Sequence, residues 1–245
     1  MPETIAHPRA HGGSARGAQI SARRVRDLLL AAIRAGRITP GSSLNEEHLM
    51  QTYSASRGAV RSALSQLTSI GILERRTRVG TRLVNAGVRI GVTDFAFGER
   101  GGVAIDVLEQ RLVPSTPLLR ERLQLDDEVV RMVENAFTLK GETIGIRTAY
   151  FSQAVTSDPT AIRQPATMST VMRDFFGKEP GLVYAWIGAE ISDARTSRIL
   201  GIAEGAPLLR RELVYLDVDD DPIQVVFDAF RADRVSFDRG PISFS

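Results

Sequence analysis

The chain has 245 residues, 43% of them apolar and 24% charged, a composition that allows a buried core in one large domain or two small ones. It contains no cysteine, which excludes disulfide bonds, thiolate metal sites and a cysteine nucleophile. No apolar run reaches the ~20 residues of a membrane span. The N-terminal residues lack the apolar stretch of a secretory signal, so we expect a cytoplasmic protein.

Charge is distributed unevenly along the chain, although the formal net charge is only +2. Residues 19–84 hold 11 arginines, no lysine and 4 acidic residues, a net of +7, whereas residues 85–245 have a net charge of −6. A compact basic segment joined to an acidic one indicates that only the first binds a polyanion.

The basic segment is preceded by residues 1–18, which are rich in Gly, Ala, Pro and His and are predicted to be a disordered tail. Hydrophobic periodicity and turn residues predict helices over 21–35, from near 45, and from 57 to about 69, then strands at 72–75 and 81–84. Either Ser43 or Asn45 can cap the second helix. Three helices and a hairpin, with a tight turn before the third helix, predict a winged helix-turn-helix over 19–84.

The third helix begins with SRGAVR, at the end that helix-turn-helix proteins present to base edges. Arg57 and Arg61 lie four residues apart on one side, and arginine binds guanine as a fork worth about 1–3 kcal/mol of discrimination. Two arginines alone would fit a solvated face on a core helix. The tight turn, the four hairpin arginines and the concentrated charge favour DNA binding. The predicted DNA contacts are Ser56, Arg57, Gly58, Ala59, Arg61, Arg75, Arg76, Arg78 and Gly80.

The acidic segment begins with the glycine-rich residues 85–100, a predicted linker, and continues with a strand-rich domain over 101–245. The predicted strands are 103–113, 128–139, 143–151, 182–192, 208–218 and 223–230, and the predicted helices are 115–124, 168–176 and 195–201. Residues 120–151 resemble residues 196–230 at an offset of 77 to 79. Each copy is a short helix and a hairpin, so we expect two units around one antiparallel sheet. Trp186 is expected in the core.

The stretch from LLLAAIRAGRITPG through SRGAVRSALSQL to TRVGTRLV resembles the winged-helix domain of the GntR family of bacterial transcription regulators. The resemblance spans essentially all of residues 19–84. It implies that Arg57 and Arg61 contact operator DNA and that the hairpin near Gly80 enters a groove. Asn45 stands where many members have proline. Arg78 stands where many have a first glycine of the hairpin, a difference that alters how its tip sits.

The stretch APLLRRELVYLDVDDDPIQVVFDAFRADRVSF resembles the UTRA effector-binding domain of the HutC-like branch of that family, over about residues 92–240. The resemblance implies an α+β protein, with a winged helix followed by an antiparallel sheet with flanking helices, similar to chorismate lyase. It also implies that residues 101–245 form both the dimerisation domain and a pocket for a small, often anionic effector. The effector-binding residues that it implies are Thr93, Asp94, Arg147, Gln224 and Phe230.

Arg147 is the expected main cation of that pocket, gripping a carboxylate, with Phe137 and Phe230 facing apolar bulk. The alternative is that Arg147 pairs with an acidic neighbour on a strand and that both phenylalanines belong to the core. All three histidines precede residue 50, so we expect no histidine metal site in the second domain and no cofactor.

We therefore predict a transcription regulator, a repressor by the family's usual behaviour, that binds an inverted-repeat operator as a homodimer and responds to a small molecule. Two alternatives stay open. One is a DNA-binding regulator without an effector. The other is an enzyme in the second domain, which the lack of His and Cys after residue 48 makes the weaker choice.

Overall fold

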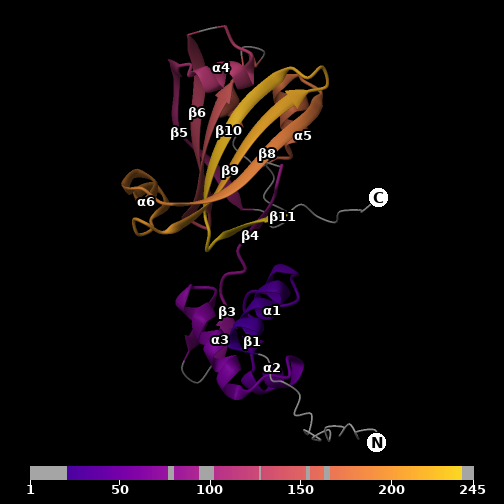
Figure 1. Ribbon diagram of the computed structural model, residues 1–245, viewed down its shortest axis with the longest axis vertical. Coiled ribbons are helices and arrows are strands. Elements are labelled where there is room, and N and C mark those ends of the chain that lie inside the picture. The colour runs from indigo at the N-terminus through magenta and orange to yellow at the C-terminus, as the bar shows by residue number, and fades with distance from the viewer. Residues whose placement is uncertain are drawn as a thin grey trace, which may run out of the picture. The chain divides into compact units, whose positions relative to one another are not determined.

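The computed structural model describes residues 21–76, 80–93, 102–126, 128–152, 155–162 and 166–238. The predicted tail, Arg78 and Asp94 lie outside these ranges. The chain divides into two compact units, residues 1–84 and 85–245 (Figure 1). No helix in the described ranges is both long and apolar enough to cross a membrane.

The described residues of the first unit form three helices and a small antiparallel sheet of strand order β1-β3-β2. The elements are α1 (Ala22–Arg34), β1 (Ser43–Leu44), α2 (Glu46–Thr52), α3 (Arg57–Ser69), β2 (Leu73–Arg76) and β3 (Gly80–Leu83). The apolar side of α3, formed by Val60, Ala63, Leu64 and Leu67, is buried. This is the predicted winged helix-turn-helix, with β1 as a short strand that the sequence pattern did not show.

Side-chain caps determine where these helices begin. The side chain of Asn45 accepts hydrogen bonds from the backbone N–H groups of Glu47 (2.8 Å) and His48 (3.2 Å). Asn45 is therefore the cap of α2, while Ser43, the other candidate, lies in β1. Capping by an asparagine contributes about 1 kcal/mol of helix stability.

The second unit is organised around a six-stranded antiparallel sheet of strand order β5-β6-β7-β10-β9-β8 (Figure 1). The strands are β5 (Val103–Pro114), β6 (Val129–Leu139), β7 (Glu142–Phe151), β8 (Pro180–Ile191), β9 (Pro207–Asp217) and β10 (Pro222–Arg231). The helices are α4 (Pro117–Leu123), the 3-10 helix η1 (Pro159–Ala161), α5 (Met168–Val171), the π-helix η2 (Met172–Phe176) and α6 (Ala194–Leu200).

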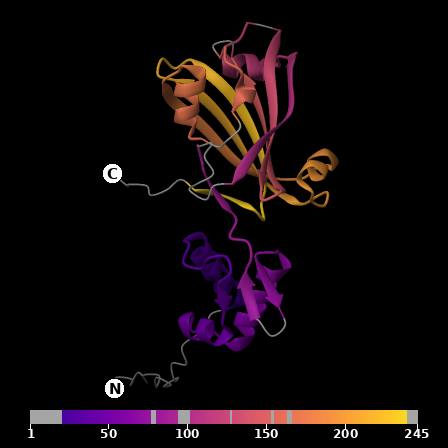
Figure 2. The same cartoon turned by 180° about the vertical axis from the view of Figure 1, so that it is seen from behind.

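The predicted internal repeat is visible in this strand order. The first copy of the repeat, β5-α4-β6-β7, is followed by the second copy, β8-α6-β9-β10, and the two copies meet where β7 pairs with β10. The helix of each copy covers a strand of the other copy, because α4 packs on β10 and α6 packs on β7. Figures 1 and 2 show these two helices at opposite ends of the sheet.

The other face of the sheet carries the largest apolar cluster. Adjacent strand residues point to opposite faces, so Val225 packs under α4 whereas Val226 faces α5 and η2. This face is also covered by a two-stranded parallel sheet of β4 (Val88–Gly91) and β11 (Val235–Asp238). Ile90 of β4 is buried in the cluster.

Two expectations are wrong. Residues 88–91 belong to a strand, although the whole of 85–100 was expected to be a linker. The partner of that strand, β11, comes from the far end of the described chain, so no local pattern indicates the pairing. Trp186 is 48% exposed instead of being in the core, because β8 is an edge strand. Its ring lies 5.0 Å from the guanidinium of Arg122 on α4.

Candidate DNA interface and effector site

The first candidate site is the N-terminal end of α3. Ser56 caps the helix, and its hydroxyl accepts a hydrogen bond from the backbone N–H of Ala59 (3.2 Å). Arg57, Gly58 and Arg61 are exposed, while Ser56 and Ala59 are half-buried. The predicted DNA contacts of α3 thus lie at the N-terminal end of a helix whose opposite, apolar side is buried. Such an end presents backbone N–H groups and a positive dipole, which favour a phosphate.

Arg61 is held by an acidic residue from the neighbouring helix. Its Nε lies 2.8 Å from Oε2 of Glu46 on α2, and both side chains are partly exposed. An ion pair in this setting contributes about 0–1 kcal/mol. Arg61 can therefore exchange Glu46 for another anion at low cost.

Neither the space around Gly58 nor its backbone conformation requires glycine at this position. A Cβ built on it meets no described atom within 4 Å, and its backbone does not lie in the left-handed region. Glycine within a helix costs up to about 1 kcal/mol relative to alanine. A small residue on an exposed basic helix end allows a partner's backbone to approach closely.

The hairpin supplies further positive charge. Arg75 and Arg76 are exposed on β2, and Nε of Arg76 lies 2.9 Å from Oε2 of Glu74. Gly80 begins β3 with φ +95°, in the region that favours glycine.

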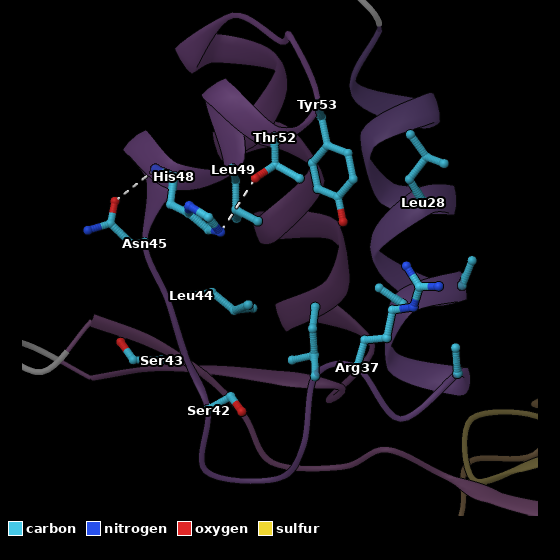
Figure 3. A pocket seen from close by; sticks show the side chains of 14 residues that line it. Leu28, Arg37, Ser42, Ser43, Leu44, Asn45, His48, Leu49, Thr52 and Tyr53 are labelled. Atoms are coloured by element: carbon cyan, nitrogen blue, oxygen red, sulfur yellow. Dashed lines mark hydrogen bonds between the residues drawn. The ribbon is translucent and has the colours of Figure 1, made fainter.

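A surface hollow of about 680 Å³ also lies in the first unit, between α1 and α2 (Figure 3). Its apolar part includes Leu28, Leu44, Leu49 and the ring of Tyr53, whose pKa is raised by burial. None of the predicted effector-binding residues lines it.

The second candidate site is a buried charge cluster on the sheet of the second unit. Asp228 of β10 is fully buried and opposes Arg147 of β7. Arg147 donates to it from Nε (2.7 Å) and Nη2 (3.1 Å), and Arg211 of β9 donates from Nε (2.8 Å). Burial raises the pKa of Asp228, but the two guanidinium groups outweigh that effect and hold it below its ordinary value.

Aromatic rings surround this cluster. Phe137 and Phe230 are fully buried, with ring centroids 5.8 Å apart. The guanidinium of Arg147 lies 5.5 Å from the Phe137 centroid, and that of Arg211 lies 5.6 Å from the Phe230 centroid. The Phe230 ring occupies the space that a Cβ at Gly145 would fill, at 2.2 Å, so position 145 requires glycine.

Arg211 connects the cluster to β4, the first strand after the first unit. Its Nη1 donates to the carbonyl oxygens of Gly91 (2.6 Å) and Val92 (3.2 Å). The hydroxyl of Tyr215, on the same strand as Arg211, donates to the carbonyl of Thr93 at 3.0 Å. The backbone of residues 91–93 is thus held by two side chains of β9.

The structure brings together Arg147, Gln224 and Phe230, all buried on one face of the sheet. Gln224 donates to the sulfur of Met168 at 3.3 Å. Thr93 is exposed. The pairing of Arg147 with Asp228 and the burial of both phenylalanines correspond to the alternative left open by the sequence. A role of Arg147 in effector binding stays a prediction.

Sequence reasoning missed Asp228 and Arg211. A signal was present, because Asp228 interrupts the apolar run of PIQVVFDAF and Arg147 interrupts that of TIGIRTAYF in the equivalent strand of the repeat. A charged residue in a strand buried on both faces requires a buried partner. Among the described residues, no three His, Asp or Glu side chains gather as a metal ion would need.

Both units match known families. Residues 21–83 match the gntR family of bacterial regulatory proteins, and residues 99–236, more than half of the chain, match the UTRA domain. The chain belongs to the GntR family, with a UTRA domain. This GntR-family chain is a transcription regulator, in which the first domain implies DNA binding and the second a small-molecule effector.

Solved structures share the fold of this GntR-family regulator. PhnF from Mycobacterium smegmatis has a TM-score of 0.62 and 22% identity, over 87% of this chain and 97% of PhnF. YydK from Bacillus subtilis has a TM-score of 0.54 and 16% identity, over 91% of this chain and all of YydK. The effector domain of PhnF alone has a TM-score of 0.51 and 20% identity, over 58% of this chain and 88% of that domain. No curated protein matches the sequence significantly.

Proposed function

We propose that this regulator is a HutC-like repressor. It binds an inverted-repeat operator as a homodimer and releases it when a small anionic metabolite binds the UTRA domain. The observation that carries the proposal is the N-terminal end of α3, where two exposed arginines and a small residue project from a helix anchored by its buried side. A two-fold operator matches a two-fold protein, because each half-site takes one recognition helix.

In this proposal, Arg57 and Arg61 read base edges, while Ser56, Gly58 and Ala59 let the helix end lie close to the DNA backbone. Arg61 leaves Glu46 when it meets DNA, an exchange that costs little because the pair is partly exposed. The hairpin contacts are Arg75, Arg76, Gly80 and Arg78, the last of which lies outside the described residues.

The test is operator binding by Arg57→Ala and Arg61→Ala, measured by gel shift at fixed salt on a site selected from random DNA. Each substitution removes one guanine fork per half-site, so binding weakens by about 1–3 kcal/mol, or about 5- to 150-fold, for each half-site occupied. Arg111→Ala is the matched control, because Arg111 has a similar exposed ion pair, with Glu109 at 2.9 Å, in the second unit. Wild-type affinity in both recognition-helix variants would contradict the proposed interface.

For the effector, we propose that an anionic group binds beside Arg147 and Arg211, near Gln224, Phe230 and the segment containing Thr93 and Asp94. The group competes with the carbonyl oxygens of Gly91 and Val92 for Arg211 and so loosens β4. Support comes from the hydrogen bonds that join Arg211 to β4. Binding would thereby shift the population towards states with less constrained DNA-binding units.

A thermal-shift screen of the full chain against anionic metabolites tests this step. A ligand at 100 times its Kd adds about 2.7 kcal/mol of stability. The same ligand should then release operator DNA in the gel shift and be recovered unchanged, because we propose binding without turnover and without a cofactor. Silence across a broad screen would favour the effector-independent regulator. The protein would act in the cytoplasm, where operator DNA lies.

A further inference from the structure

The surface hollow of the first unit lies between two helices that pack on the same third helix. Both α1 and α2 pack on α3, and the hollow of about 680 Å³ occupies the space between α1 and α2 (Figure 3). Sites for small molecules commonly measure about 300–1,000 Å³ and often lie between the helices of a bundle. The hollow thus has the size and the location of a ligand site.

One wall of the hollow is apolar and partly open to water. Leu28 of α1 is 47% exposed, although Val25, Leu29 and Ile33 of the same helix are buried. Leu44 of β1 and Leu49 of α2 also line the hollow. An apolar group that covers Leu28 would remove this surface from water, which is favourable.

Two hydrogen-bond donors lie beside this apolar wall. The guanidinium of Arg37 and the hydroxyl of Tyr53 line the hollow, and Figure 3 shows both side chains extending into it. Neither group has a hydrogen bond or an ion pair with another described residue. Burial raises the pKa of Tyr53, so its hydroxyl keeps its proton and can donate. Both donors are thus available to a ligand.

The charge of the hollow determines the sign of the ligand. Among the described residues that line it, Arg37 is the one with a permanent charge, and none is acidic. Residues 19–84 have a net charge of +7, which attracts anions to this unit. An arginine binds a carboxylate through two parallel hydrogen bonds. The ligand that fits both the charge and the apolar wall is therefore an amphipathic anion.

We propose that the hollow between α1 and α2 is a second small-molecule site, which binds an amphipathic carboxylate of the size of a medium-chain fatty acid. The carboxylate accepts hydrogen bonds from Arg37 and Tyr53, and the apolar chain covers Leu28. The inference goes beyond the effector site proposed in the second unit, because the two sites share no residue. It gives the DNA-binding unit a ligand of its own.

Titration calorimetry of the full chain with decanoate, below the concentration at which decanoate forms micelles, tests this site. The wild type should bind decanoate. Inorganic phosphate, which has the negative charge but no apolar body, should not displace decanoate at the same concentration. Displacement by phosphate would mean that the site recognises any anion, and would overturn the proposed class of ligand.

Two substitutions locate the bound carboxylate and its matched control defines the background. Arg37→Gln should weaken decanoate binding about tenfold, the effect of losing one hydrogen bond to a charged group. Arg34→Gln is the control, because Arg34 is an exposed arginine of α1 that does not line the hollow. It should bind decanoate as the wild type does.

A second pair of substitutions locates the apolar chain. Leu28→Glu places a carboxylate where the chain lies and should weaken decanoate binding at least about tenfold. Ile70→Glu is the control, because Ile70 is 48% exposed in the same unit and does not line the hollow. Circular dichroism checks that each variant is folded, as expected for substitutions of exposed side chains.

The outcomes separate this site from other binding. Unchanged affinity in either Arg37→Gln or Leu28→Glu would overturn the proposal, because decanoate would then bind elsewhere on the chain. An equal loss in the two controls would also overturn it, because the effect would then come from the charge of the unit as a whole. A wild type that does not bind decanoate would assign the hollow to a protein partner instead.

Discussion

Replacing Asp228 by asparagine tests how much the buried charge cluster contributes to the stability of the second unit. Asparagine keeps the size of the side chain but removes the charge that faces the guanidinium groups of Arg147 and Arg211 at 2.6 to 3.1 Å. Removing one partner from a buried ion pair costs about 3–5 kcal/mol. A unit of this size loses about 2–4 °C per kcal/mol, so its Tm should fall by roughly 6–20 °C.

Urea unfolding followed by tryptophan fluorescence measures this effect at one fixed protein concentration. Trp186 is the sole tryptophan and lies in the second unit, so the signal reports that unit. Glu179→Gln is the control, because it removes an exposed ion pair with Arg173 and should cost at most about 1 kcal/mol. If the free energy of unfolding of Asp228→Asn also stays within about 1 kcal/mol of the wild type, the buried cluster does not contribute the roughly 3–5 kcal/mol expected of it.

The wild type and Asp228→Asn should also differ in how their stability responds to acid. The pKa of Asp228 is lowered in the folded state, so its contribution is present above the unfolded pKa of about 4. It is lost as the pH falls through the lower folded pKa. The stability gap between wild type and Asp228→Asn should therefore be constant near neutral pH and narrow below about pH 4.

Three further substitutions test single contacts. Gly58→Ala should stabilise the first unit by up to about 1 kcal/mol in urea unfolding yet weaken operator binding, and unchanged binding would show that position 58 does not approach DNA. Glu46→Gln should raise operator affinity by up to about fivefold per half-site in the gel shift, because Arg61 no longer has to leave a carboxylate. A lowered affinity would contradict this exchange. Gly145→Ala should cost the second unit about 1–3 kcal/mol, because its Cβ meets the buried ring of Phe230, and wild-type stability would mean that the ring can move.

The elements with strong periodicity were predictable from the sequence. Each of the six strands of the large sheet lies within two residues of its predicted bounds, and α1 and α3 follow their apolar spacing. The internal repeat predicted that two helix-hairpin units share one sheet, and the strand order confirms it. These features depend on contacts between neighbouring residues or on similarity within the chain, both of which a single sequence records.

Long-range pairings were not predictable. The strands β4 and β11 have four residues each, and nothing in VRIG or VSFD identifies one as the partner of the other. The exposure of Trp186 depends on β8 being an edge strand, which only the full strand order reveals. The candidate site shows the same division. The basic end of α3 could be read from spacing, whereas Asp228 and Arg211 acquire their roles from strands that meet in space.

The pairing of β4 with β11 has a consequence for the order in which the protein is made. Arg89 and Asp238 of these strands are joined by an ion pair across 149 positions. During synthesis the DNA-binding unit can fold first, while the pairing of β4 must await β11, which is translated much later. A chain that stops before residue 235 should still contain a folded DNA-binding unit, but its β4 would lack the β11 strand with which it pairs. Premature termination is thus expected to yield an unregulated operator binder instead of an inert fragment.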